Sequence, residues 1–361
     1  MFVAWRDLRF AKGRFALVGA VITLITLLVG LLSGLTAGLG RQNISAITGL
    51  PADRIAFAAP AAGQSLSYAD STVTARQWDR WAEVPGVTRA EPLGITTTKA
   101  TAGARSTAVS AFGVGPGSRL APDGGKVRGD TAVLSRTAAD DLGVGPGGSF
   151  TLAGRTLTVA AVQGDASFSH TPVIWTSLAL WQQVAPPTRA AGPTATVIAL
   201  DLTTGADVTA ADRALGTRTV SKGDSLSAIG SYSSENGSLQ LMRGFLFAIS
   251  ALVVGAFFTV WTIQRGGDIA VLKALGASTA HLLRDALGQA AVLLVTGTLL
   301  GTGIAAALGA TVVGAAVPFL LTPATVLVPA AVMILLGTLG AALSVRRITS
   351  VDPLTALGSA R

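Results

Sequence analysis

The sequence predicts a membrane protein with four transmembrane α-helices and a large extracytoplasmic α+β domain between the first and the second helix. Three observations predict this fold class. Half of the 361 residues are hydrophobic and only 13% are charged, whereas soluble domains carry about 25% charged residues. Long uncharged stretches interrupt the chain, and short basic segments flank them. This pattern is typical of a protein that crosses a membrane several times.

The first predicted transmembrane helix covers residues 15–40, which carry no charge. This stretch is long enough to cross a hydrocarbon core of about 30 Å. A secretory signal peptide is the competing interpretation, because a basic start precedes the apolar residues. The apolar core of a signal peptide has about 7–15 residues, which is shorter than this stretch, and no small-x-small cleavage site follows it. We therefore expect a membrane helix.

Two further uncharged stretches predict the remaining three helices. Residues 244–264 suit one span, whereas residues 286–345 are too many for one helix and suit two spans joined by a turn. Pro318 and Pro323 favour a turn between them, because proline interrupts helices. The last two predicted helices are 286–312 and 324–345, with a short outer loop at 313–323.

The basic segments predict how the chain is oriented. They lie at 1–14, 265–285 and 346–361, and positive charge gathers on the cytoplasmic side of membrane proteins. We therefore expect both termini and the 265–285 loop in the cytoplasm, and residues 41–243 outside. Residues 1–14 also have the pattern of an amphipathic helix on the inner surface, with a plain stop-transfer flank as the alternative. Abundant Ala, Gly and Arg with few Lys suggests a high-GC genome, and we expect a bacterial plasma membrane.

Residues 41–243 have the pattern of a mixed α+β domain. Short runs rich in β-branched residues, such as Thr131–Ser135 and Thr156–Gln163, predict strands. Helices are expected at 74–84 and 205–216. We expect two subregions, namely a small β-barrel-like part near 95–185 and a helix–strand part made from both flanks.

The sequence offers no motif for catalysis. The phosphate-binding pattern G-x-x-x-x-G-K-[ST] is absent, because Gly124-Gly125-Lys126 is followed by valine. Two histidines and no cysteine cannot assemble a zinc site, and there is no nucleophile elbow. Charge is nearly balanced in 41–243, which argues against nucleic-acid binding. We expect no enzyme activity, no catalytic residue, no intrinsic cofactor and no bound metal other than a possible haem iron.

The cytoplasmic loop between the second and third helices has a recognisable pattern. Ile269, Leu272 and Leu275 have helical spacing with charges between them, and Gly276 can end such a helix in a left-handed cap. A short helix on the inner membrane face could dock in a groove of a separate protein. A plain connector between two spans is the alternative.

Residues 265–278 resemble the signature of FtsX/MacB-like permeases, the type VII ABC transporters, in the order Arg-x-x-Asp-Ile-x-Val-Leu-Lys-Ala-Leu-Gly-Ala-Ser. The Asp-Pro and Ala-Leu pairs in 351–357 resemble the ending of the same family, and 130–162 resembles its outer-domain barrel. The resemblance covers the whole chain. It implies a homodimer, or a pair of related permeases, with two cytoplasmic ATPase subunits that bind ATP and Mg. This sequence contains no MacB-type ATPase domain, so we expect the ATPase to be a separate chain.

The same resemblance implies a mechanism called mechanotransmission, in which ATP-driven dimerisation below the membrane moves the outer domains above it. The loop 265–280 would be the helix that couples the two. Its implied contact residues are Arg265, Asp268, Ile269, Leu272, Lys273, Leu275 and Gly276.

Within this family the chain resembles the haem-exporter permease (HrtB-like) branch at 5–15, 31–39, 169–175 and 235–242. That branch would bind haem at the dimer interface near the outer leaflet, and haem needs an apolar slot and an axial donor. Glu235 and Met242 are seven residues apart and so share a helix face. In a two-fold dimer each donor would appear twice.

Tyr232, one turn before Glu235, and His170, in an outer-domain turn, complete the candidate haem-binding residues. The alternatives are ordinary structural roles. Glu235 would then be a solvated residue, Met242 a filler of the apolar core and His170 a surface histidine.

Two classes of function stay open at this point. The first is ATP-driven export of an amphipathic molecule, with haem favoured over a macrolide, a peptide or a lipid. It predicts a dimer cleft in which Gly30, Gly34 and Gly38, with small-xxx-small spacing, allow close helix approach. The second is a non-transporting, FtsX-like assembly whose outer domain activates a cell-wall enzyme.

Overall fold

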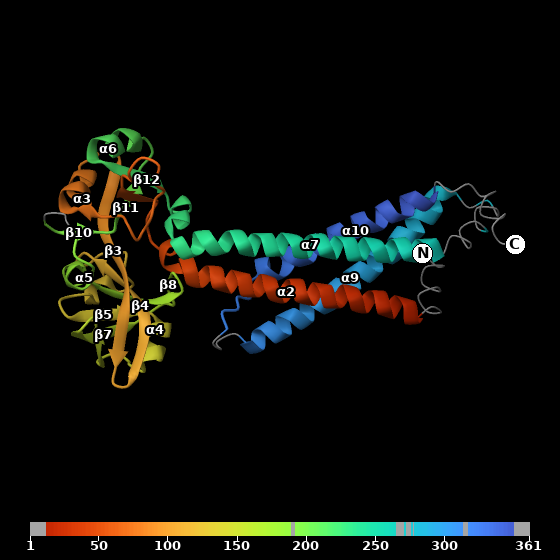
Figure 1. Ribbon diagram of the computed structural model, residues 1–361, viewed down its shortest axis with the longest axis horizontal. Helices are drawn as coiled ribbons and strands as arrows, with labels where there is room; N and C mark the ends of the chain where they lie inside the picture. Colours follow the sequence, from red (N-terminus) through yellow and green to blue (C-terminus); the bar gives the residue numbers. More distant parts are fainter. Residues whose placement is uncertain are drawn as a thin grey trace. The chain divides into compact units, whose positions relative to one another are not determined.

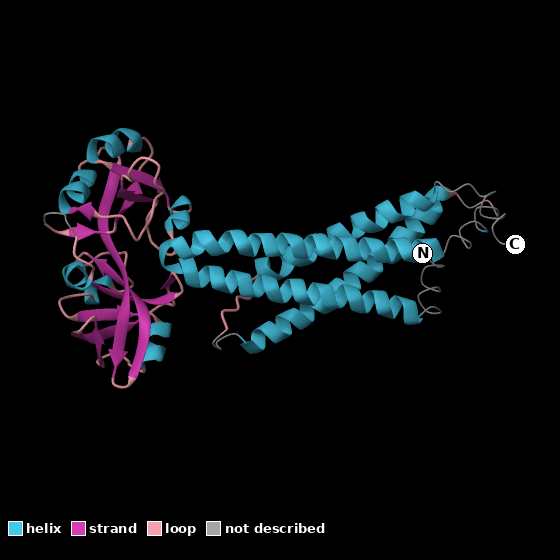
Figure 2. Cartoon of the chain, in the orientation of Figure 1, coloured by secondary structure: helices cyan, strands magenta, loops and turns pink. Residues whose placement is uncertain are grey.

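The computed structural model describes residues 12–188, 192–264, 271, 276, 278–312 and 317–349. The chain divides into two compact units, whose elements are drawn in Figures 1 and 2. We call Met1–Gly38 together with Ser238–Arg361 the membrane unit, and Leu39–Gly237 the inserted domain.

Long apolar helices make up the described part of the membrane unit. In the described residues four helices contain a segment long and apolar enough to cross a membrane, which confirms the predicted number of spans. They are α2 (Lys12–Thr48), α7 (Gly230–Gln264), α9 (Thr279–Val312) and α10 (Pro323–Thr349). Pro323 is the first residue of α10, a position where its missing N–H breaks no helical hydrogen bond.

The helices are longer than the uncharged stretches that predict them. The helix α2 continues past Gly40 to Thr48, and α7 begins at Gly230, well before residue 244. Charge marks where a chain leaves the hydrocarbon, whereas a helix ends where its backbone bonding and packing end. The residues between these two limits, 41–48 and 230–243, therefore belong to helices and not to loops of the domain.

Small residues let the helices of the membrane unit approach closely. Ile22, Phe258 and Leu294 come from three different helices and share one buried core. A Cβ added to Gly301 of α9 would lie 2.5 Å from the carbonyl oxygen of Thr23 in α2. Helices in lipid associate through such backbone contacts, because lipid tails are as apolar as the side chains.

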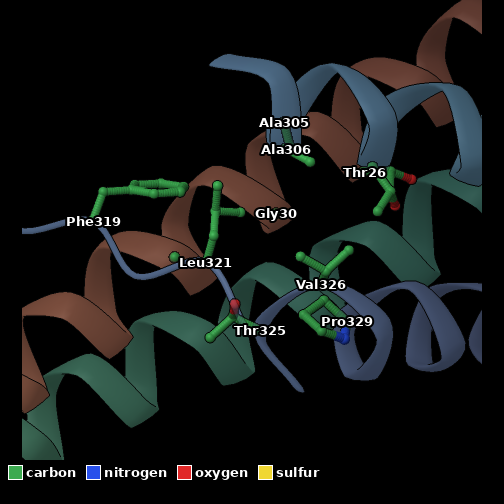
Figure 3. A pocket seen from close by; sticks show the side chains of 11 residues that line it. Thr26, Gly30, Ala305, Ala306, Phe319, Leu321, Thr325, Val326 and Pro329 are labelled. Atoms are coloured by element: carbon green, nitrogen blue, oxygen red, sulfur yellow. The ribbon is translucent and has the colours of Figure 1, made fainter. Parts of the chain in front are cut away.

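The three glycines predicted for helix packing lie against other parts of the same chain. A Cβ on Gly30 would lie 2.9 Å from the Cβ of Ala305, and one on Gly34 would overlap the ring of Phe319. Gly38 approaches the backbone of Pro318. Figure 3 shows Phe319 beside Gly30, in a narrow pocket between α2, α9 and α10. A dimer contact through Gly34 and Gly38 would have to displace the segment 317–322, and one through Gly30 would have to displace α9.

The inserted domain is built on one large sheet with the strand order β12-β1-β11-β3-β4-β9-β5-β7-β6. Its strands are β1 (Arg54–Ala58), β3 (Val87–Ala102), β4 (Arg105–Val114), β5 (Thr131–Leu134), β6 (Ser149–Leu152), β7 (Arg155–Val162), β9 (Thr171–Ser177), β11 (Val197–Leu202) and β12 (Thr217–Ser221), and β8 (Ser167–Phe168) pairs with β9. The short strands β2 (Val73–Thr74) and β10 (Thr194–Ala195) form a separate pair.

An extra pairing closes part of this sheet into a barrel. Because β3 also pairs with β6 at Ala100 and Thr101, the strands β3, β4, β9, β5, β7 and β6 form a ring. The remaining strands, β12, β1 and β11, form a flank sheet on the first half of β3. These are the two subregions that the sequence predicts, and β3 runs through both (Figure 1).

Short helices cover the two subregions. The helices α3 (Ala75–Ala82) and α6 (Val208–Leu215) lie by the flank sheet, and α4 (Arg136–Leu142) and α5 (Leu178–Val184) lie by the barrel (Figure 1). The helices α3 and α6 match those expected at 74–84 and 205–216, and α4 lies within the run 130–162, whereas α5 was not predicted. In α4 the Ser135 hydroxyl accepts from the Ala138 N–H, and Gly143 ends the helix with a φ of 67°.

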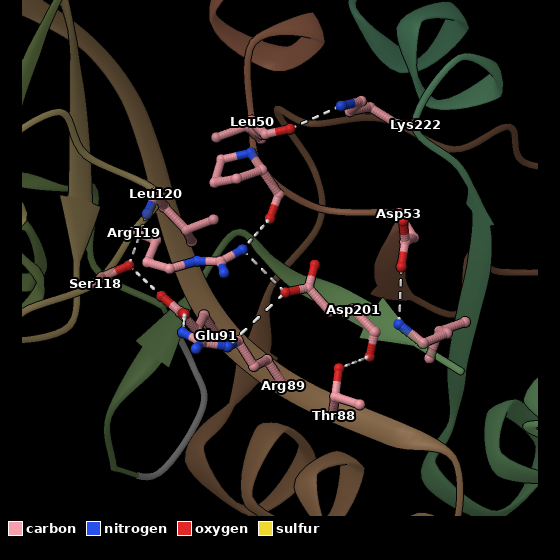
Figure 4. A network of polar contacts seen from close by, with 12 residues as sticks. Leu50, Asp53, Thr88, Arg89, Glu91, Ser118, Arg119, Leu120, Asp201 and Lys222 are labelled. Carbon is pink, nitrogen blue, oxygen red and sulfur yellow. Dashed lines mark hydrogen bonds and ion pairs between the residues drawn. The ribbon is translucent and has the colours of Figure 1, made fainter.

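A polar network fastens the end of α2 to the flank sheet (Figure 4). The Arg119 guanidinium lies 3.3 Å from Asp201 of β11 and 3.4 Å from the Pro51 carbonyl oxygen. The Asp53 carboxylate accepts from the Leu202 N–H at 2.9 Å, and Lys222 donates to the Leu50 carbonyl at 2.7 Å. Residues 50–53, which directly follow α2, are thus held by three separate parts of the domain.

Glycine packing in the membrane unit can be tested by two alanine substitutions in α2. Gly34→Ala should lower the thermal unfolding midpoint, because the new methyl group overlaps Phe319 and overpacking costs about 1–3 kcal/mol. Gly19→Ala meets no atom within 4 Å and should raise stability by about 0.5–1 kcal/mol through helix propensity. The measurement is thermal unfolding of the detergent-purified chain. Equal shifts for both variants would contradict the packing described above.

Candidate functional site

A tight turn carries the histidine that the sequence singles out. The strands β8 and β9 pair Phe168 with Thr171, so Ser169 and His170 form a two-residue hairpin loop. Their φ angles are 49° and 64°, as a type I′ turn requires at both positions. Such turns strongly prefer Asn-Gly, since other residues in this region cost of order 1–3 kcal/mol each. The surroundings must therefore hold this turn in place.

Backbone hydrogen bonds hold the turn against the end of α2. The Ser169 N–H donates to the Asn43 carbonyl at 3.0 Å, and the His170 N–H donates to the Gln42 carbonyl at 3.2 Å. The Ser45 hydroxyl accepts from the Ser167 N–H at 2.9 Å and donates to the Ser167 carbonyl at 3.2 Å. The hairpin is thus bonded at several points to the segment 42–45.

Side chains from α2, the turn and α7 meet in one cluster. The His170 Nε2 lies 2.8 Å and 3.0 Å from the two carboxylate oxygens of Glu235. Asn43 Nδ2 lies 3.4 Å from the same carboxylate and 3.0 Å from His170 Nε2. When the imidazole carries its proton on Nε2, it donates to the Glu235 carboxylate. The Asn43 Nδ2 group can donate to the same carboxylate.

A pair of serines extends the cluster. The Ser231 hydroxyl donates to Asn43 Oδ1 at 2.6 Å and lies 2.8 Å from the Ser169 hydroxyl. Asn43 is only 1% exposed, whereas the Glu235 side chain is 43% exposed. The cluster therefore has a buried amide as its centre and a carboxylate that reaches the surface.

The structure brings together two of the four predicted donors. His170 and Glu235 are in contact, although 65 residues separate them in the chain. Tyr232 is half-buried and packs against the core that contains Phe57 and Phe112. Met242 belongs to the membrane unit, where 49% of its surface is exposed. Whether any of these residues binds haem stays a prediction.

The predicted coupling residues fall mostly outside the described part of the chain. This applies to Arg265, Asp268, Ile269, Leu272, Lys273 and Leu275. Gly276 is described, and its φ of 92° lies in the left-handed region, which a glycine at a helix cap commonly adopts.

Sequence reasoning missed Asn43, Ser169 and Ser231. Asn43 lies just beyond the predicted span 15–40, two residues after the charged Arg41, so charge alone assigns it to the domain and not to a helix. A usable signal was the apolar helical period, which continues through Ile44 and Ile47. Among the described residues there is no group of three or more His, Asp or Glu side chains that could hold a metal ion.

Comparison with protein families identifies the class of this chain. The MacB-like periplasmic core domain model matches residues 17–218, and the FtsX-like permease C-terminal model matches residues 241–353. The chain therefore belongs to the MacB/FtsX family of ABC transporter permeases. The inserted domain is the extracytoplasmic domain of such a permease, and ATP hydrolysis belongs to a separate ABC ATPase subunit.

Full-length relatives are known from several bacteria. The chain is 25% identical to the "putative hemin transport system permease protein HrtB" of Staphylococcus haemolyticus, over 99% of both chains. It is 27% identical to an uncharacterized ABC transporter permease of Mycobacterium bovis, also over 99% of both chains. The solved periplasmic region of MacB from Actinobacillus actinomycetemcomitans aligns with a TM-score of 0.34 and 12% identity, over 49% of this chain and 92% of that chain.

The role of Asn43 in the cluster can be tested by truncation. Asn43→Ala removes both the acceptor for Ser231 and the donor beside Glu235. It should lower stability by about 1–3 kcal/mol, because buried partners are left unsatisfied. Gln42→Ala is the matched control, because Gln42 offers its backbone carbonyl to the turn and keeps it on substitution. Thermal unfolding of the full chain measures both variants. Equal losses would show that the Asn43 side chain does not hold the turn.

Proposed function

We propose that this permease exports haem, working as a homodimer with two copies of its ABC ATPase. The observation that carries the proposal is the Glu235 carboxylate, which is oriented by His170 and Asn43 and still 43% exposed. A full-length relative named as a hemin transport permease supports the choice of haem. The two histidine distances place the imidazole beside both carboxylate oxygens.

The chemistry of the cluster suits an oxygen donor to ferric haem. A carboxylate has several lone-pair sites, so it can accept from His170 and still offer one to iron. Hydrogen bonds to such a carboxylate fix its direction and tune its strength as a ligand. In a two-fold dimer the donor would appear twice, once for each face of the porphyrin. Tyr232 and Met242 are further candidate donors.

The proposed location is a bacterial plasma membrane with both termini in the cytoplasm. Basic residues at 1–14, 265–285 and 346–361 support this orientation. The ATPase would then bind the cytoplasmic loop 265–285. Movement driven by ATP binding would pass from this loop through the membrane helices to the extracytoplasmic domain, as in mechanotransmission.

Haem binding can be tested by titrating the detergent-purified permease with haemin. We expect a saturable, shifted Soret band, and Glu235→Gln should weaken the affinity at least about tenfold because it removes the anionic oxygen. Met242→Ala tests the second predicted donor. Glu83→Gln, an exposed carboxylate at the end of α3, is the control and should bind as the unaltered chain does.

The outcomes of this titration separate the functions that the sequence leaves open. A wild-type chain without a saturable Soret change would rule out haem and favour another amphipathic substrate. Haemin should also stimulate ATP hydrolysis by the reconstituted permease–ATPase complex. Absence of stimulation by haemin or by any lipid or drug tested would favour a non-transporting regulator of a cell-wall enzyme.

Coupling to the ATPase can be tested at Gly276. Its φ of 92° is hostile to β-branched side chains, so Gly276→Val should reduce substrate-stimulated ATP hydrolysis by more than half. Gly276→Asn is the matched control, because asparagine tolerates the left-handed region. The measurement is the ATPase rate of the reconstituted complex. Retention of full activity by the valine variant would contradict a role for this backbone position.

A further inference from the structure

A large cleft opens in the inserted domain between the barrel and the flank subregion. Its volume is about 690 Å³, which lies within the range of about 300–1,000 Å³ typical of ligand sites. Its lining residues include Tyr68, Thr96, Thr97, Trp181 and Thr196. Ser169 and Ser231, which contact each other, both line the cleft, so the cleft lies next to the cluster around Glu235. Glu235, His170 and Asn43 are not among its described lining residues.

An unpaired stretch of strand edge opens into this cleft. On one edge, β3 pairs with β11 as far as Leu93 and with β6 from Ala100 onward. Between these residues no strand pairs with that edge in the described structure, but the Thr196 hydroxyl bonds both the N–H and the carbonyl of Ile95. The open part of the edge is therefore centred on Thr97.

The direction of the backbone groups shows what this edge offers. The Leu93 carbonyl accepts from the Thr196 N–H at 3.0 Å, and the Ile95 N–H donates to the Thr196 hydroxyl at 2.7 Å. The Lys99 carbonyl accepts from the Ala153 N–H at 3.4 Å. Backbone groups of alternate residues point to the same edge in an antiparallel ladder. The N–H and C=O of Thr97 therefore also point to this edge, into the cleft.

Trp181 contributes apolar ring surface to the cleft. Its ring lies on Gly94 and Gly113, where an added Cβ would overlap it, and the residue lines the cleft with 6% of its surface exposed. The Trp181 Nε1 has no hydrogen-bond partner in the described structure, but it is buried with almost no accessible surface. An occupant of the cleft would therefore meet the ring and not the indole N–H.

The described residues that line the cleft carry no charge. They contribute hydroxyl, aromatic, proline and aliphatic side chains and no acidic, basic or histidine side chain. Burial raises the pKa of the Tyr68 hydroxyl, which donates to Ser225 and stays neutral. An ionised group buried against these residues would lose its hydration without gaining a counter-ion from them. They therefore favour an occupant whose buried part is uncharged.

We propose that this cleft binds an extended, uncharged segment of a partner polypeptide, which adds to the open edge of β3 at Thr97. A polypeptide is the class of ligand that supplies an N–H and a C=O together with the spacing of a strand. Its side chains would meet the Ser and Thr hydroxyls of the walls and the ring of Trp181. The site does not depend on the identity of the exported substrate.

The probe for this site is a fluorescein-labelled, acetylated peptide of three Thr-Val repeats, measured by anisotropy with the detergent-purified full chain. We expect saturable binding. Methylating alternate backbone nitrogens of the peptide should weaken its binding at least tenfold, because strand addition needs those donors. Replacing the threonines with glutamates should weaken binding to a similar degree, because the described lining offers no counter-ion.

Two variants of the protein make the test specific. Ala69→Trp should abolish binding, because Ala69 is an exposed lining residue whose enlargement fills the cleft without touching the sheet. Thr97→Pro removes the edge N–H and should weaken binding at least tenfold. Ala104→Trp, in the exposed β3–β4 turn, is the control and should leave binding unchanged. No saturable binding, or equal binding by the methylated peptide or by Ala69→Trp, would overturn the proposal.

Discussion

The inserted domain depends on one strand that serves two structures. Over its first half β3 is the outer strand of the flank sheet, and over its second half it closes the barrel through β6. Both partners occupy the same edge of the strand, and they diverge between Leu93 and Ala100. A sheet that bends away from itself in this manner has to leave backbone groups unpaired at the divergence. The open edge at Thr97, which lines the cleft, follows from that constraint.

The turn at Ser169–His170 shows how the domain keeps an unfavourable backbone conformation. Neither residue is suited to its positive φ, and a local preference alone would let the hairpin relax. Bonds to the carbonyl groups of residues 42 and 43, and the side chains of Asn43, Ser231 and Glu235, hold it instead. Strain of this kind usually accompanies a functional site. The turn, α2 and α7 are therefore parts of one arrangement, in which the Glu235 carboxylate has a fixed direction.

Much of the architecture could be predicted from the sequence, because its signals are local. Uncharged length gives the four helices, proline gives the start of α10, and β-branched runs with glycine turns give the barrel strands. The resemblance at 265–278 and 351–357 led to the family that the comparisons establish. The ends of α2 and α7 could not be predicted from charge, because the helices continue beyond the membrane where polar residues are allowed.

The candidate site was predicted in its parts but not in its assembly. Glu235 and His170 were named as separate donors, and their contact depends on a hairpin and a helix that are far apart in the chain. Asn43 was missed because a buried amide has no sequence pattern of its own. The glycines of α2 were recognised as contact residues, but spacing alone does not say which surface they meet. Here Gly30 meets Ala305 of α9, whereas Gly34 and Gly38 meet the segment 317–322. A single aromatic residue in such a short connection leaves no periodic pattern in the sequence.

The ring of Phe319 acts as a spacer between two helices of the membrane unit. It faces Gly34 on α2 and Gly309 on α9, and the Leu320 N–H donates to the Gly34 carbonyl at 3.0 Å. A side chain on either glycine would overlap the ring. One aromatic side chain from a short connection therefore fixes the separation of α2 and α9 at this level, and a smaller residue at position 319 would leave a cavity between them.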